Sequence, residues 1–149
     1  MGLRGASCFV EPGLLKMKLQ RGPNHPLLRA VRGADERVGT VLDGTLGLAH
    51  DALFLAAALD TQVRGVERSD VIALLLEEGL PRLGRTIPAA RRISVEHAHA
   101  HDLLRDAQDD SVDVVFLDPM MSWEKGASGT FGALRAFAWP ERADAPLLE

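Results

Sequence analysis

Apolar and polar positions follow two different periods along residues 38–118. Short apolar runs, typical of buried strands, occupy 38–42, 62–66, 93–96 and 112–117. Between these runs, apolar residues recur at helical spacing and predict helices over 50–59, about 70–80 and 101–107, the second of them capped by Ser69. Strands that alternate with helices predict a parallel sheet covered on both faces, which is a doubly wound α/β fold.

The flanks of this region carry weaker patterns. Residues 1–24 show little periodicity and contain Pro12 and Pro23, so we expect an arm with one short extended stretch near Phe9 and Val10. A short helix is expected at 25–31, ended by Gly33, and a last helix at 131–137. The chain therefore divides into a basic N-terminal arm with a short helix (1–36) and a core (37–149). Because doubly wound sheets usually have about five or more strands, we expect the C-terminal strands to be missing.

Composition and charge narrow the class of protein. A chain of 149 residues with 46% hydrophobic residues fits one compact domain. The net charge is −4, but residues 1–37 carry +4 and residues 38–149 carry −8. This asymmetry suits a basic arm that contacts RNA phosphates beside an acidic body, and a solvated terminus is the alternative.

Cysteine usage and hydropathy predict where the protein works. The single cysteine, Cys8, excludes an intrachain disulfide framework and indicates a reducing, cytoplasmic setting. No apolar run reaches the roughly 18 residues that span a bilayer, and no signal-peptide pattern opens the chain, so no membrane partner is expected. The sequence carries no signal for a particular oligomeric state.

Every predicted strand ends in a polar residue: Asp43, Glu67, the 97–99 segment and Asp118. Ligands of open parallel sheets bind at this edge. Gly44 and Gly47 would let the backbone approach a ligand, although a structural turn is the alternative. Glu67 lies twenty positions after Gly47, where an acid can accept both ribose hydroxyls. Asp43 would repel a pyrophosphate, so the pattern favours an adenosyl cofactor that carries an amine and a sulfonium over a dinucleotide.

The fourth strand is followed by Asp118 and Pro119. Proline fixes its own φ and holds the preceding residue extended, so the Asp118 carboxylate can be aimed at one point. There it could accept hydrogens from an exocyclic amine and orient the nitrogen lone pair toward a methyl donor. A plain turn is the alternative.

Three histidines at alternate positions, His97, His99 and His101, provide a rival hypothesis. On an extended strand they would share one face, as in a zinc-dependent hydrolase. A polar rim of the cofactor pocket is the interpretation we favour.

The motifs together resemble a known family. The segments VLDGTLGLAHDALFLA, VRGVERSDVIALLLEEGL, VEHAHA and VDVVFLDPM look like class I S-adenosylmethionine-dependent methyltransferases, which have a Rossmann-like core. More narrowly they resemble the RsmJ type, which methylates the exocyclic N2 of a guanine in small-subunit ribosomal RNA. The flanking segments FVEPGLLKMKLQRGPNHPLLRAV and ALRAFAWPERADAPLLE are also similar to that family.

The resemblance implies roles for particular residues. The cofactor, S-adenosyl-L-methionine, would be contacted at His50, Asp51, Glu67, Arg68, His99, Ala100 and Asp118 in addition to Asp43, Gly44 and Gly47. Asp118 and Pro119 would be catalytic, no metal would be needed, and RNA would lie on Lys16, Lys18, Arg21 and Arg29. The sequence departs from the family at Ala49, His50 and Met121, where glycine, arginine and an aromatic residue are usual. A relative that binds cofactor or RNA without turnover is a third hypothesis.

Overall fold

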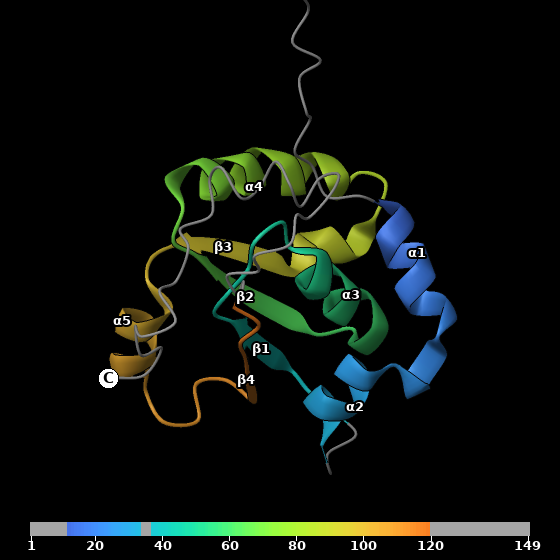
Figure 1. Ribbon diagram of the computed structural model, residues 1–149, viewed down its shortest axis with the longest axis horizontal. Coiled ribbons are helices and arrows are strands. Elements are labelled where there is room, and N and C mark those ends of the chain that lie inside the picture. The colour runs from blue at the N-terminus through green and yellow to red at the C-terminus, as the bar shows by residue number, and fades with distance from the viewer. Residues whose placement is uncertain (1–11, 34–36, 120–149) are drawn as a thin grey trace, which may run out of the picture.

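The computed structural model (Figure 1) describes residues 12–33 and 37–119. Its elements, in chain order, are α1 (Pro12–Gln20), η1 (Gly22–Asn24), α2 (Pro26–Arg32), β1 (Thr40–Asp43), α3 (His50–Leu59), β2 (Gln62–Glu67), α4 (Asp70–Leu83), η2 (Pro88–Arg92), β3 (Ile93–His97), α5 (Ala100–Arg105) and β4 (Val114–Phe116). The stretch near Phe9 and Val10, the helix at 131–137 and any strands after it lie outside the described residues.

The four strands form one parallel sheet in the order β3-β2-β1-β4. Val41 of β1 pairs in register with Val63 of β2 on one side and with Val114 of β4 on the other. The α/β prediction is therefore confirmed. Since the strands are parallel, their carboxyl ends meet at one edge, and the order places β1 between β2 and β4.

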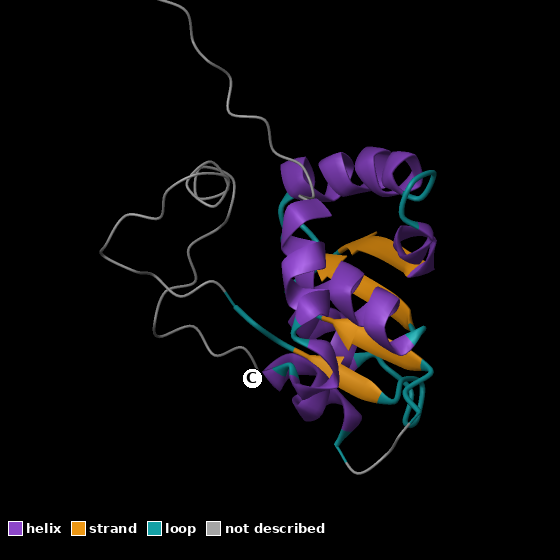
Figure 2. Ribbon diagram, turned by 90° about the vertical axis from the view of Figure 1, so that its right-hand side faces the viewer, coloured by secondary structure: helices purple, strands orange, loops and turns teal. Residues whose placement is uncertain are grey.

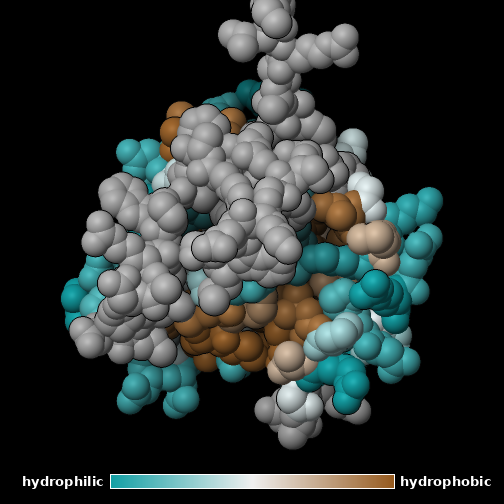
Figure 3. Space-filling model, viewed as in Figure 1, coloured by the Kyte–Doolittle hydropathy of each residue, from teal (hydrophilic) through white to brown (hydrophobic). Residues whose placement is uncertain are grey.

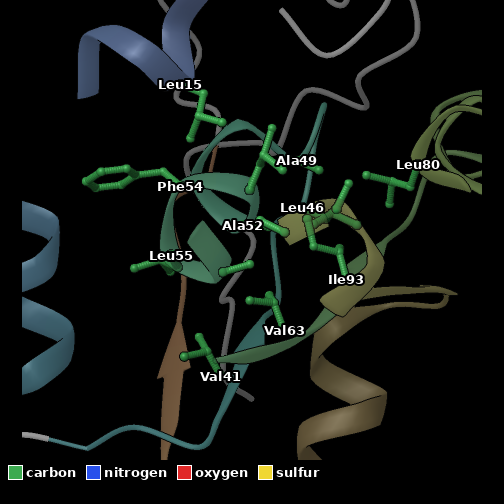
Figure 4. Close-up of a cluster of buried hydrophobic side chains, with 14 of the residues drawn as sticks. Leu15, Val41, Leu46, Ala49, Ala52, Phe54, Leu55, Val63, Leu80 and Ile93 are labelled. Atoms are coloured by element: carbon green, nitrogen blue, oxygen red, sulfur yellow. The ribbon is translucent and has the colours of Figure 1, made fainter. Parts of the chain in front are cut away.

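The main core lies between this sheet and α3 (Figures 2 and 4). Val41, Val63 and Ile93 belong to one buried cluster with the apolar side of α3, in which residues 52–56 are all buried. Leu76 and Leu80 add α4 to the same cluster. Both helices share a face because right-handed crossovers from β1 to β2 and from β2 to β3 advance in the same direction.

Helices cover the two faces of the described sheet unequally. Arg64 of β2 and Glu96 of β3 lie on the face opposite α3, stay 45% and 53% exposed, and pair at 3.7 Å. The crossover rule explains the difference, because only the connection from β3 to β4 can pass over this face.

The N-terminal segment differs from the expected arm. Pro12, at the first helical position, begins α1, where its missing N–H costs nothing. Leu15 of α1 is buried in the cluster around α3 (Figure 4), and the ring of Phe54 lies 4.5 Å from that of His25 and 5.9 Å from Lys18 Nζ. The periodicity of α1 is weak because most of its nine residues are exposed or half-buried. The division at residue 37 stays a prediction.

The second helix follows its prediction closely. His25 Nδ1 accepts a hydrogen bond from the Leu27 N–H at 3.2 Å and caps α2, and Gly33 ends the helix with a φ of 53°.

On the face shown in Figure 3, an apolar area lies in the lower centre of the view, with polar side chains to its right and below it. Within the described residues, no helix combines the length and the apolar character that crossing a bilayer requires.

Candidate functional site

Asp43 is the most deeply buried acid at the carboxyl edge of the sheet. Its side chain ends β1 and is 1% exposed, and Oδ1 accepts a hydrogen bond from the Thr45 N–H at 3.0 Å. Burial, with a smaller contribution from the charges of Asp51 and Asp118, raises the pKa of Asp43 to about 7, and the Thr45 hydrogen bonds oppose this shift. No salt bridge of Asp43 is found within residues 12–33 and 37–119, and a positively charged ligand group would favour its ionised form.

Thr45 joins the ends of β1 and β4. Its Oγ1 accepts a hydrogen bond from the Asp118 N–H at 2.7 Å, while the Gly44 N–H donates to the Phe116 carbonyl oxygen at 3.0 Å. The turn thus fixes the backbone of Asp118 beside Asp43. We did not single out Thr45 from the sequence, although its place between the two turn glycines was a usable signal.

Glu67 organises the backbone at the end of β2. One carboxylate oxygen accepts the Gly47 N–H at 2.9 Å and the other accepts the Ser69 N–H at 2.8 Å. Each oxygen keeps a second lone pair, so the carboxylate can still accept ribose hydroxyls. The predicted pair of Gly47 and Glu67 is brought together, in the arrangement that a nucleoside site needs.

The glycines of the first turn are required by space and by conformation. A Cβ on Gly44 would lie 2.5 Å from the Leu117 side chain and 3.2 Å from the Ala100 Cβ. Gly47 has a φ of 52°. The turn after β1 therefore touches both the start of α5 and the end of β4.

The segment that opens α3 contains two departures from the pattern of the family that the motifs resemble, Ala49 and His50. Ala49 has a φ of 57°, in the left-handed region where the family usually has glycine. The next residue, His50, begins α3. Asp51, in the first turn, pairs with Lys18 of α1. Lys18, predicted to contact phosphate, is thus already engaged with a carboxylate, which sequence spacing could not reveal.

His97, His99 and His101 do not share one face of a strand, as the zinc-hydrolase hypothesis requires. The strand ends at His97, so His99 instead caps α5 through the His101 N–H at 3.2 Å, and His101 lies in the helix beside Asp102. His97 Nε2 lies 2.8 Å from the Asp70 carboxylate. The zinc-hydrolase hypothesis is wrong on this geometry, and no three potential metal ligands gather among the described residues.

His99 lies at the carboxyl edge of the sheet, beside the end of β2. Its Nε2 lies 3.5 Å from Arg68 Nη1, immediately after Glu67. The predicted cofactor residues at the ends of β2 and β3 are thus neighbours, as a pocket rim requires.

Comparison with known proteins identifies the family. The family model described as "Putative SAM-dependent methyltransferase" matches residues 11–130. The chain belongs to this family. The resemblance found in the motifs is confirmed, and the cofactor of the family is S-adenosylmethionine.

Individual relatives are more specific. The chain is 42% identical over 113 residues to ribosomal RNA small subunit methyltransferase J of Aliivibrio fischeri strain MJ11. This alignment covers 70% of the chain and 43% of the relative. It is 29% identical over 131 residues to the protein of the same name from Alteromonas mediterranea, covering 87% of this chain and 50% of the relative. The chain spans about half the length of these curated relatives.

A solved structure supports the fold. The crystal structure of a SAM-dependent methyltransferase from Neisseria gonorrhoeae matches with a TM-score of 0.63 and 23% identity, over 80% of this chain and 51% of that chain. The Rossmann-like core predicted from the resemblance is therefore confirmed.

The donor set fits the family's cofactor. S-adenosylmethionine carries an ammonium and a sulfonium, and Asp43, Asp51 and Asp118 interact electrostatically at this edge. A dinucleotide would instead bring phosphate charge to a buried carboxyl, at a cost in free energy.

Proposed function

We propose that the chain forms the cofactor-binding part of an RNA methyltransferase that modifies the exocyclic N2 amine of a guanine in small-subunit ribosomal RNA. One observation carries the proposal: Asp43, Glu67 and Asp118 close three neighbouring strands at one edge, around the turn of Gly44 and Gly47. The names of the relatives support RNA as the substrate class.

The residues divide the work between holding the cofactor and orienting the amine. Glu67 accepts the ribose hydroxyls, and Asp43, as carboxylate, offsets the positive charge of the amino acid part. Arg68, His99 and Ala100 border the adenine, and His50 and Asp51 line the start of α3. When bound, S-adenosylmethionine supplies an already activated methyl group, so no nucleophilic side chain is needed.

Asp118 carries the positioning role. It is exposed, and its backbone is fixed by Thr45 and by the following Pro119. Its carboxylate accepts a hydrogen bond from the guanine N2 amine and so orients the lone pair of the amine nitrogen toward the methyl group. With the cofactor bound, the amine nitrogen would form its bond to the methyl group, and the Asp118 carboxylate or water would take the proton that the amine loses. The target guanine reaches this edge of the sheet either by flipping out of an RNA helix or because it is already unpaired.

The basic N-terminal segment contributes RNA binding in this proposal. Lys16, Arg21 and Arg29 are positioned on or between α1 and α2 and would contact backbone phosphates without reading sequence. We assign the reaction to a cytoplasmic setting, where ribosomal RNA is modified.

A single-turnover assay tests the proposal. Unmodified small-subunit ribosomal RNA is incubated with the chain and S-adenosylmethionine labelled in its methyl group, and the nucleosides are then separated. We expect label in N2-methylguanosine, a loss of at least roughly a hundredfold in rate for Asp118→Ala, and a much smaller loss of S-adenosylhomocysteine binding, because the main cofactor contacts of Glu67 and Asp43 remain. Asp109→Asn, at an exposed loop acid, is the matched control. Equal rates for Asp118→Ala and wild type would overturn the role of Asp118.

A further inference from the structure

An open pocket of about 630 Å³ lies beside α2 and shares no lining residue with the site at the sheet edge. The residues that line it are Pro23, Pro26, Arg29, Ala30, Arg32 and Gly33. Two of the six are arginines and none is an acid, so the pocket favours an anion.

The surroundings of the pocket reinforce this preference. Residues 12–33 contain five lysines and arginines and no aspartate or glutamate. Lys18 is paired with Asp51, but no ion pair found among the described residues includes Arg29 or Arg32. Their positive charge is therefore not offset within the described part of the chain. The next acids in sequence, Asp35 and Glu36, lie outside it.

Arg32, which lines the pocket, also has an unsatisfied hydrogen-bond donor. Its Nε is buried and has no hydrogen-bond partner within the described residues. A buried N–H without an acceptor costs free energy, and natural structures rarely leave one. The planar guanidinium matches the geometry of phosphate oxygens, which would supply the acceptor.

His25, next to the pocket-lining Pro26, has a pKa that is shifted by its surroundings. Burial lowers the pKa of His25, and the charges of Lys18 and Arg21 lower it further. The neutral ring can then cap α2 through Nδ1, which accepts the Leu27 N–H. Asp51 opposes this shift, but residues 12–33 themselves carry five lysines and arginines and no acid, in contrast to the acidic edge of the sheet.

We propose that this pocket seats a backbone phosphate of the RNA substrate, held by the guanidinium groups of Arg29 and Arg32. The inference rests on the proposed function for the identity of the RNA. The phosphate contact itself is independent of sequence, so it can be tested without the natural target. In this arrangement α2 anchors the strand while the sheet edge receives the base.

Fluorescence anisotropy with a labelled oligouridylate of about twelve nucleotides tests the pocket. Arg29→Ala/Arg32→Ala is compared with Arg82→Ala/Arg105→Ala, which removes the same charge from arginines already paired with acids on α4 and at α5. Arg29→Lys/Arg32→Lys keeps the positive charge and removes the planar guanidinium groups with their paired N–H donors. S-adenosylhomocysteine binding and the melting temperature establish that each variant is folded.

We expect the pocket variant to bind the oligonucleotide roughly tenfold more weakly and to lose about 0.7 in salt slope for each phosphate contact removed. The control variant should change affinity by less than about twofold, and the lysine variant should fall between wild type and the alanine variant. An affinity and a salt slope equal to wild type in the pocket variant would overturn the proposal. Failure of the wild-type chain to bind the oligonucleotide would also overturn it. The same holds if, in a parallel assay with phosphatidylglycerol vesicles, the pocket variant loses vesicle binding but keeps oligonucleotide binding.

Binding of the oligonucleotide is separate from methyl transfer. If the pocket variant loses oligonucleotide binding but no N2-methylguanosine forms with any protein, the pocket stands and the proposed function fails. If methylation proceeds and the variants bind equally, the proposed function stands and the pocket fails.

Discussion

Asn in place of Asp43 should stabilise the protein and impair the cofactor site. In the folded chain the pKa of this carboxyl rises from 3.8 to about 7, chiefly through burial. Because the folded pKa is raised, the folded state binds the proton more tightly than the unfolded state. The resulting stability is fully present below pH 3.8 and is lost as the pH rises through about 7.

The size of the effect follows from linkage. At about 1.4 kcal/mol per pH unit, the raised pKa of Asp43 lowers the free energy of unfolding, relative to its value below pH 3.8, by about 2 kcal/mol at pH 5 and about 4 kcal/mol at pH 8. Asp43→Asn removes this titration, and its amide oxygen can still accept the Thr45 N–H. The stability advantage of the variant should therefore grow by about 2 kcal/mol from pH 5 to pH 8.

Urea denaturation at the two pH values measures this growth. Any constant effect of the amide cancels when the two differences are compared, and Asp109→Asn, at an exposed acid, is the matched control for replacing a carboxylate with an amide. Calorimetry should also show weaker S-adenosylhomocysteine binding by Asp43→Asn, because the cation loses its partner. A stability difference that stays constant, or that shrinks toward pH 8, would refute the reasoning.

Three further changes test the packing and the hydrogen bonds around the site. A Cβ on Gly65 would lie 2.4 Å from the Leu46 side chain, so Gly65→Ala should lower the free energy of unfolding by about 1–3 kcal/mol in urea titrations. Gly79→Ala, on α4 with open space around it, should raise it by about 0.5–1 kcal/mol, and destabilisation there would contradict the assigned helix interior. Glu67→Ala leaves two N–H groups without a charged acceptor, so we expect a loss of about 2 kcal/mol and at least roughly tenfold weaker S-adenosylhomocysteine binding; calorimetry that finds wild-type affinity would exclude the ribose role.

Local patterns were sufficient to predict most of the fold. The apolar runs and helical spacing of residues 38–118 predict β1 to β4 and the helices between them, because each element buries a recognisable face. The first helix was missed since Pro12 read as a breaker and only Leu15 of its described side chains is buried. A nine-residue helix that buries so little has almost no periodic signal.

The site was predictable where it follows from strand ends and not where it depends on distant contacts. Asp43, Glu67 and Asp118 were found because parallel strands bring their carboxyl ends together. The pairing of Lys18 with Asp51 spans 33 positions and leaves no mark in local sequence. The rival hypothesis of one strand face for the three histidines is not supported, because the strand ends at His97 and His101 lies in α5.

Calorimetric titration of the chain with S-adenosylhomocysteine tests the central claim most directly, namely that the carboxyl edge of this sheet holds the cofactor. We predict saturable binding with a stoichiometry near one per chain, weakened by Glu67→Ala and by Asp43→Asn but not by Asp109→Asn. A folded chain that shows no saturable heat, or that binds NAD in its place, would contradict the account.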